Sequence, residues 1–201
     1  MKAERRISVD HAAIHRWVIR FSLLLLERFI RPKRAVTGKR HVDETDIKGR
    51  GQRMYLYRAI DSVGDTVDFF FSEHRDLAAA KRFFKQALDR HGPPDRVVID
   101  GGWTNSEAIA SCDQTYRIES DALETTLPIT FKKSKYLNNR IEQDHRRIKR
   151  LIDPMLGFKS AASANIILSG IELVHMMRKR RARFADNPNP SLAEQFANLA
   201  T

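Results

Sequence analysis

Cysteine is almost absent from this sequence: Cys112 is the only one among 201 residues. A single thiol excludes an internal disulfide and leaves no partner thiolates for a cysteine-rich zinc site. This usage is typical of a reducing compartment, so we expect the protein in the cytosol. We interpret Cys112 as a small buried hydrophobic residue.

Long hydrophobic runs are also missing. The longest near the amino end, residues 21–26, is far shorter than the ~20 residues that cross a bilayer, and charged residues follow it at once. The opening residues have no adjoining apolar stretch, so they do not form a secretory signal. The sequence therefore predicts no membrane span.

Acidic residues are in the minority: 36 lysines and arginines face 25 aspartates and glutamates, which leaves a formal net charge of +11. An excess of this size favours a polyanionic partner, either nucleic acid or an anionic membrane surface. Charge alone does not choose between the two. The length suits one domain with short appendages, not two full domains.

One amphipathic helix is predicted near the amino end, followed by a linker. Ser8 provides a helix-starting hydroxyl, and apolar residues at helical spacing follow it. The stretch 31–40 contains one proline, one glycine and five basic residues, which is typical of a solvated linker. Within the helix we interpret the apolar positions as one core-facing stripe, made of Ile14, Trp17, Val18 and Phe21.

Three strand-like segments rich in Val, Ile, Tyr and Phe come next, at 41–48, 54–61 and 65–72. Turns of hairpin length separate them, so we expect an antiparallel meander. Residues 77–90 carry their apolar side chains on one helical stripe. The short apolar strand at 96–99 is of the kind buried in the middle of a sheet. A helix between two strands predicts a parallel crossover.

The second half contains a short helix at 106–112, an irregular acidic stretch at 117–127 and a short strand at 129–131, as we interpret the pattern. Two long helices follow at 140–155 and 160–183. Three antiparallel strands, a helix, a buried strand and a long helix are the order of a ribonuclease-H-like fold. The predicted class is therefore mixed α/β, with helices flanking the sheet.

Three carboxylates are candidates for a metal site. Asp43 lies on the first strand, Asp100 directly follows the buried strand, and Glu142 lies in the first turn of a long helix. Strands one and four are neighbours in this fold, so the two aspartates could lie side by side, with the helix supplying the third ligand. Hard divalent cations prefer carboxylate oxygens, and a pair of them roughly 3.5–4 Å apart can break or join a phosphodiester.

Each carboxylate also has a purely structural explanation, as a solvated strand end, a turn residue or part of a helix cap. The basic residues after Glu142 have two explanations as well. Pairing of Glu142 with Arg146 would stabilise the helix by only ~0.2–0.5 kcal/mol. The functional alternative is that His145, Arg146 and Lys149 hold DNA phosphates beside the metal. The pattern alone leaves both alternatives open.

Several blocks of this sequence resemble one family in the right order. They are HVDET (41–45), YLYRAID (55–61), GDTVDF (64–69), AAKRF (79–83), YLNNRIEQDHR (136–146) and PMLGFKS (154–160). These blocks resemble the DDE transposases of the insertion-sequence-six group, whose catalytic domain is similar to that of retroviral integrases. The resemblance extends over nearly the whole chain.

The resemblance implies that Asp43, Asp100 and Glu142 are the catalytic triad and the metal ligands. It implies Mg²⁺ as the cofactor, with Mn²⁺ as a substitute, and no nucleotide cofactor. The implied chemistry is attack of a DNA 3′ hydroxyl on a target phosphodiester. The implied partners are double-stranded DNA, as element ends and as target, and further copies of the chain, with no membrane partner. The implied location is the bacterial cytoplasm, at the nucleoid.

The chain departs from the family pattern around two of these ligands. Asp46 stands where family members have an aromatic residue, so we expect it to alter the local charge or compete for metal. Gly101 stands where they have a lysine. The interval from Asp100 to Glu142 is several residues longer than usual, which an insertion within 103–128 would explain, since surface loops tolerate added length.

The amino end departs as well. Residues 7–21 resemble the recognition-type helix that completes the family's helix-turn-helix, and Arg16 within it is a candidate DNA contact. Without the preceding helix we expect weak or absent recognition of terminal inverted repeats. We therefore divide the chain into a helix-turn-helix remnant at 1–30, a basic linker at 31–40, a ribonuclease-H-like catalytic domain at 41–185 and a tail at 186–201.

Three functions are compatible with these residues. The first is a transposase, truncated at its amino end, that joins DNA strands. The second is a DNA-binding remnant that is inactive because of the truncation, and the third is a nuclease that uses the same carboxylates with water as the nucleophile. Only the products of the reaction separate the first from the third.

Overall fold

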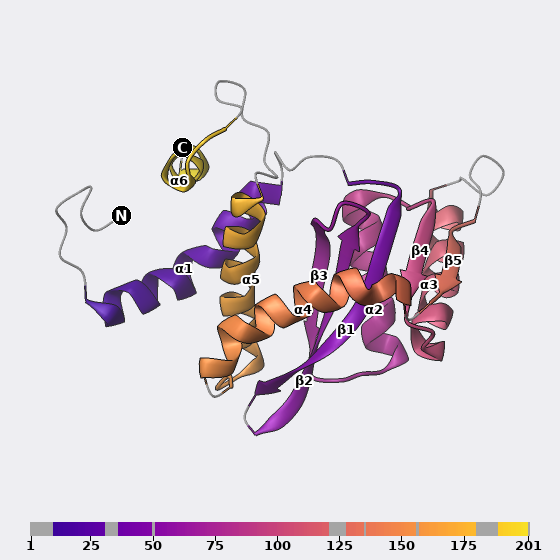
Figure 1. The fold of residues 1–201 in the computed structure, drawn as a ribbon, viewed down its shortest axis with the longest axis horizontal. Helices are drawn as coiled ribbons and strands as arrows, with labels where there is room; N and C mark the ends of the chain where they lie inside the picture. The colour runs from indigo at the N-terminus through magenta and orange to yellow at the C-terminus, as the bar shows by residue number, and fades with distance from the viewer. Residues whose placement is uncertain are drawn as a thin grey trace. The chain divides into compact units, whose positions relative to one another are not determined.

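The computed structural model describes residues 10–30, 36–49, 51–120, 128–134, 136–155, 157–179 and 189–200. The chain divides into two compact units. Residues 35–161 form the larger unit, which contains the sheet, and residues 1–34 with 162–201 form the smaller, helical unit (Figure 1). Within the described part of the chain, every helix is too short or too polar to cross a membrane.

One five-stranded mixed sheet forms the centre of the larger unit. Its strands stand in the order β3-β2-β1-β4-β5. β1, β2 and β3 pair antiparallel, whereas β4 runs parallel to β1 and β5 parallel to β4. This order confirms the predicted ribonuclease-H-like, mixed α/β fold. The strands are β1 (Lys39–Gly49), β2 (Gln52–Asp61), β3 (Thr66–Ser72), β4 (Arg96–Ile99) and β5 (Thr130–Lys133).

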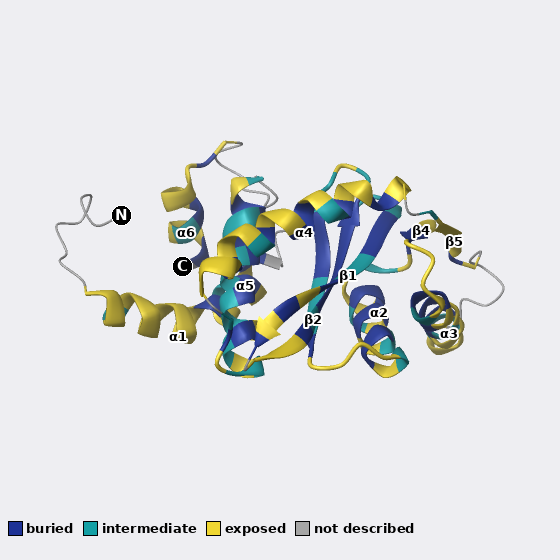
Figure 2. Cartoon of the chain, turned by 60° about the horizontal axis from the view of Figure 1, so that its bottom comes forward, coloured by how far each residue is buried: buried dark blue, intermediate teal, exposed yellow. Residues whose placement is uncertain are grey.

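Helices cover both faces of this sheet. α2 (Leu77–His91) and α3 (Trp103–Glu119) pack against each other on one face, and α4 (Asn139–Ile152) contacts β1 and β2 on the other (Figure 2). Side chains alternate along a strand. Val42 of β1 therefore packs into the core with α2 and α3, whereas Asp43 lies on the α4 face. Two short 3₁₀ helices, η1 (Tyr136–Asn138) and η2 (Asp153–Met155), flank α4.

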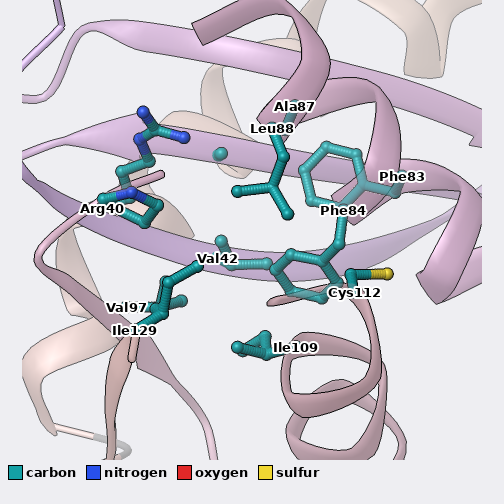
Figure 3. A pocket seen from close by; sticks show the side chains of 12 residues that line it. Arg40, Val42, Phe83, Phe84, Ala87, Leu88, Val97, Ile109, Cys112 and Ile129 are labelled. Atoms are coloured by element: carbon teal, nitrogen blue, oxygen red, sulfur yellow. The ribbon is translucent and has the colours of Figure 1, made fainter. Parts of the chain in front are cut away.

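The core between the sheet and α2 and α3 contains a small cavity of about 20 Å³. It has room for about one water molecule. Figure 3 shows that Val42, Phe84 and Ile109 line it with other apolar side chains, while the guanidinium of Arg40 lies at one end. A cavity this small and apolar is a packing gap without room for a substrate.

α3 is longer than predicted. We expected a helix at 106–112 and an irregular stretch at 117–127, but one continuous helix runs from Trp103 to Glu119. Buried Asp113 accepts a hydrogen bond at 3.2 Å from the backbone just before β5, which ties the far half of the helix to the core. Sequence spacing does not reveal such a tertiary bond. The remainder of the predicted irregular stretch, 121–127, lies outside the described residues.

The smaller unit contains α1 (His11–Ile30), α5 (Ala161–Arg178) and α6 (Leu192–Ala200). The predicted cap Ser8 lies outside the described residues. The carboxylate of Asp10 accepts the N–H of Ala13 at the start of α1. α6 lies within the predicted tail. Its start is a capping box, in which Ser191 and Glu194 each accept the other's backbone N–H.

The predicted core-facing stripe of α1 is wrong. The buried apolar residues of α1 lie near its end, at Leu26 and Phe29. Apolar residues occur almost all around this helix, so their spacing does not determine which face packs. The residues of the predicted stripe are 37% to 51% exposed. They are Ile14, Trp17, Val18 and Phe21.

Candidate active site

Asp43 is the most enclosed of the three predicted carboxylates. It lies on the central strand of the sheet, and only 15% of its side chain is exposed. Its Oδ1 accepts the backbone N–H of Glu44 at 2.9 Å. Its Oδ2 lies 3.7 Å from Nδ1 of His145 on α4. The strand therefore presents one carboxylate to the inner face of α4.

Asp43 lies within electrostatic reach of the other two candidates. Burial, and after it the negative charges of Glu44, Asp100 and Glu142, raise the pKa of Asp43 from 3.8 to about 7. Each of these charges disfavours the ionised form of Asp43. The fold thus brings the three predicted carboxylates into one acidic region, at the α4 side of β1 and the end of β4.

The three side chains do not meet at one point. Among the residues that the structure describes, no three His, Cys, Asp or Glu side chains lie close enough together to hold one ion. Asp100 instead accepts the backbone N–H of Gly102 at 3.0 Å, as in an ordinary turn. Glu142 lies 4.0 Å from Arg146, the pairing expected one helical turn apart. Asp100 therefore lies as a turn residue does, and Glu142 as a residue paired on the surface of a helix does.

The chemistry of the region nevertheless fits a hard divalent cation. Its donors are carboxylate oxygens, which Mg²⁺ and Mn²⁺ prefer. Burial and repulsion from the neighbouring carboxylates together raise the pKa of Asp43 to about 7. A cation would remove that repulsion. Asp43, Asp100 and Glu142 are the residues that would hold it.

A buried ion pair fixes α4 against the sheet beside Asp43. Arg58 of β2 lies directly opposite Asp43 in the sheet and is fully buried. Its guanidinium pairs with Asp144 of α4 and also donates to Thr66 at 3.1 Å. At the start of the helix, the Asn138 amide donates to a β1 backbone carbonyl at 3.1 Å. These contacts set where Glu142 stands relative to Asp43.

The sequence reasoning missed these residues. The available signal was Arg58 itself, a charged residue between apolar neighbours in the buried part of β2. A charge is seldom fully buried without a partner. Such a residue predicts an acidic partner elsewhere, but the pattern does not say that the partner is Asp144.

His145 does not lie on the exposed surface of α4, and this corrects the predicted arrangement. It stands on the helical face of Ile141 and Ile148, and it is 6% exposed. Arg146 is 72% exposed. His145 therefore lies against Asp43, and of the three predicted phosphate contacts only Arg146 and Lys149 reach the surface.

The other predicted features lie as follows. Lys149 donates to Asp46 at 3.1 Å, and this hydrogen bond lowers the pKa of Asp46. Asp46 thus faces Lys149, with half of its side chain exposed. Arg16 is exposed on α1 in the smaller unit. Two further arginines, Arg147 and Arg150, are exposed on α4, so its outer surface is strongly basic.

Known proteins resemble this chain over most of its length. Residues 38–181 match a family described as a DDE domain. The chain is 33% identical over 180 residues to the transposase for insertion sequence-like element IS431mec of Staphylococcus aureus, covering 90% of this chain and 75% of that protein. It is also 33% identical over 179 residues to the transposase for insertion sequence element IS257 in transposon Tn4003 of Staphylococcus aureus, covering 89% and 75%.

Among solved structures, the catalytic core domain of HTLV-2 integrase in complex with magnesium, in its trimeric form, overlaps with a TM-score of 0.48. The two sequences are 14% identical, over 71% of this chain and 87% of that one.

Proposed function

The chain belongs to the DDE-domain family of insertion-sequence transposases, and from this premise we propose that it catalyses metal-dependent DNA strand transfer. In this reaction a DNA 3′ hydroxyl attacks a phosphodiester of the target. The observation that carries the proposal is the acidic region around Asp43, in which burial and the charges of Glu44, Asp100 and Glu142 raise the pKa of this aspartate. Carboxylates with pKa values raised in this way are typical of functional sites.

In the proposed mechanism Asp43, Asp100 and Glu142 bind Mg²⁺, or Mn²⁺ in its place. The bound cation would activate the attacking oxygen and stabilise the leaving one. Asp43 must lose its proton before it can act as a ligand. Asp100 and Glu142 must move from the positions in which they contact the Gly102 N–H and the Arg146 guanidinium to share an ion with Asp43.

The remaining residues position DNA and the ligands. Arg146, Arg147 and Arg150 on the exposed surface of α4 would contact phosphates of double-stranded DNA, which fix its register without reading its sequence. Arg16 would add a contact from α1. The pair Arg58–Asp144 would keep Glu142 at its place over the sheet. The proposed reaction involves two DNA ends and a target, so we expect several copies of the chain to assemble on the DNA.

The test is a strand-transfer assay with the full chain, a duplex bearing a free 3′ hydroxyl, a plasmid target and Mg²⁺ or Mn²⁺. We expect a covalently joined product, which Asp43→Asn or Glu142→Gln abolishes. Glu119→Gln makes the same chemical change on α3, where the side chain is 58% exposed, and should leave the product unchanged.

Each other outcome contradicts the proposal in a recognisable way. Undiminished joining by either active-site variant removes these carboxylates from the mechanism. Cleaved target without a joined product indicates a nuclease. Salt-sensitive DNA binding with no product under either metal indicates a DNA-binding protein without catalysis.

A further inference from the structure

Asp46 and Lys149 form an exposed ion pair beside the candidate active site. The Lys149 ammonium donates to Oδ1 of Asp46 at 3.1 Å. Asp46 is 52% exposed and Lys149 34% exposed, so a large ligand can reach both. Lys149 lies seven residues after Glu142, which is about 10 Å along a helix. The pair therefore occupies the surface that DNA would cover in the proposed function.

Asp46 is an acidic residue within a basic surface. Arg146, Arg147 and Arg150 are exposed on the same helix, and the charge of Arg53 on β2 also acts on Asp46. Lys149 faces the Asp46 carboxylate, so its charge is neutralised locally and not offered to a phosphate. Because both side chains are exposed, removal of the carboxylate leaves the Lys149 ammonium open to a phosphate.

We propose that Asp46 restrains DNA binding by neutralising Lys149, so that the chain binds DNA with one phosphate contact fewer than its lysines and arginines allow. Replacing Asp46 releases Lys149 to the DNA backbone. This inference rests on the proposed function only in requiring that DNA lies on α4, and it needs no metal and no catalysis.

The expected effect follows from counterion release. Each phosphate contact adds about 0.9 to the slope of log affinity against log salt. If a variant with one added contact binds as tightly as the unchanged chain at about 1 M salt, it therefore binds about eightfold tighter at about 0.1 M salt. A carboxylate that acts only through its long-range charge would change the affinity less, because salt screens it.

The experiment measures fluorescence anisotropy of a short labelled DNA duplex with the full chain in EDTA, over a range of salt concentrations. Four proteins are compared: the unchanged chain, Asp46→Asn, Lys149→Met and the double variant. We expect Asp46→Asn to bind about fivefold to tenfold tighter at about 0.1 M salt, with a slope steeper by about 0.9. In the Lys149→Met background the same substitution should leave the slope unchanged and alter affinity by less than about twofold.

Asp89→Asn is the matched control. It also removes one exposed carboxylate from a lysine, Lys85 at 3.8 Å, but on α2, which covers the other face of the sheet. It should change affinity by less than about twofold, as expected for a screened charge. Equal melting temperatures of all variants will show that the fold is unchanged.

Two results overturn the inference. One is an unchanged affinity and slope in Asp46→Asn. The other is an equal gain from Asp46→Asn with and without Lys149, which would assign the effect to net charge. A chain that binds no duplex in any form contradicts the proposed function together with this inference, whereas DNA binding that ignores Asp46 contradicts this inference alone.

Discussion

Replacement of Asp43 by asparagine should stabilise the metal-free chain while it abolishes strand transfer. The folded chain holds the proton of Asp43 up to about pH 7, whereas an unfolded chain releases it near pH 3.8. A carboxyl with a raised pKa makes the folded state less stable as pH rises from about 4 to about 7, and the penalty is constant above that. Asparagine keeps the shape and the acceptor for the Glu44 N–H but carries no charge.

The size of the gain follows from the shift. From 3.8 to about 7 is about three pKa units, and each unit corresponds to about 1.4 kcal/mol. The upper limit is therefore about 4 kcal/mol above pH 7, and relaxation and water entry reduce it, so we expect about 1–4 kcal/mol. Near pH 5 the gain should be less than half as large.

The assay is urea unfolding of both proteins in EDTA near pH 5 and near pH 8. Asp46→Asn is the control with the opposite expectation, because Lys149 lowers the pKa of Asp46 and the substitution should bring no gain at either pH. Added Mg²⁺ should stabilise the unchanged chain and not the Asp43→Asn variant. Equal stability of the two proteins at pH 8, or a gain that does not depend on pH, would refute the reasoning.

Three further predictions concern the frame around the site. Arg58→Met should cost about 3–5 kcal/mol in urea unfolding, because Asp144 stays buried without its partner, and adding Asp144→Leu should restore most of the loss; a cost under about 1 kcal/mol would contradict the pairing. Ser191→Ala should destabilise the start of α6 by about 0.5–2 kcal/mol in amide exchange, with unchanged exchange rates counting against the capping box. Burial raises the pKa of the Cys112 thiol, so a thiol reagent at pH 8 should modify the folded chain at least about tenfold more slowly than free cysteine; the rate of free cysteine would indicate an exposed thiol.

The strand order could be predicted because its causes are local. Alternating side chains, hairpin-length turns and the apolar strand β4 each leave a pattern within a few residues. These patterns gave β1, β2, β3 and β4 to within two residues at either end. Once a helix lies between β3 and β4, a parallel crossover follows, and the order of the sheet has few alternatives.

The details of the site could not be predicted in the same way, because they depend on tertiary contacts. Glu142 and His145 are three residues apart on one helix, yet one is partly exposed and the other buried against Asp43. Helical periodicity places a residue within a broad face, and the partner strand decides which edge of that face is covered. Arg58 and Asp144 are 86 residues apart, so no local pattern links them.

In the smaller unit, the buried face of α1 could not be predicted. The spacing of apolar residues in α1 predicts one buried stripe, but this helix is apolar on nearly every side. Leu26 and Phe29 are buried, whereas Trp17 is half exposed. Where polar residues do not mark the outer face, the sequence does not select one.

The measurement that tests the central claim most directly is Mn²⁺ binding, followed by electron paramagnetic resonance, in the full chain and in three single variants. Asp43→Asn, Asp100→Asn and Glu142→Gln should each weaken binding at least about tenfold, since loss of a residue that only hydrogen-bonds to a metal ligand already costs about 10–100-fold. Glu119→Gln should bind as the unchanged chain does. Unaltered Mn²⁺ affinity in any one of the three variants would show that these carboxylates do not share a metal site.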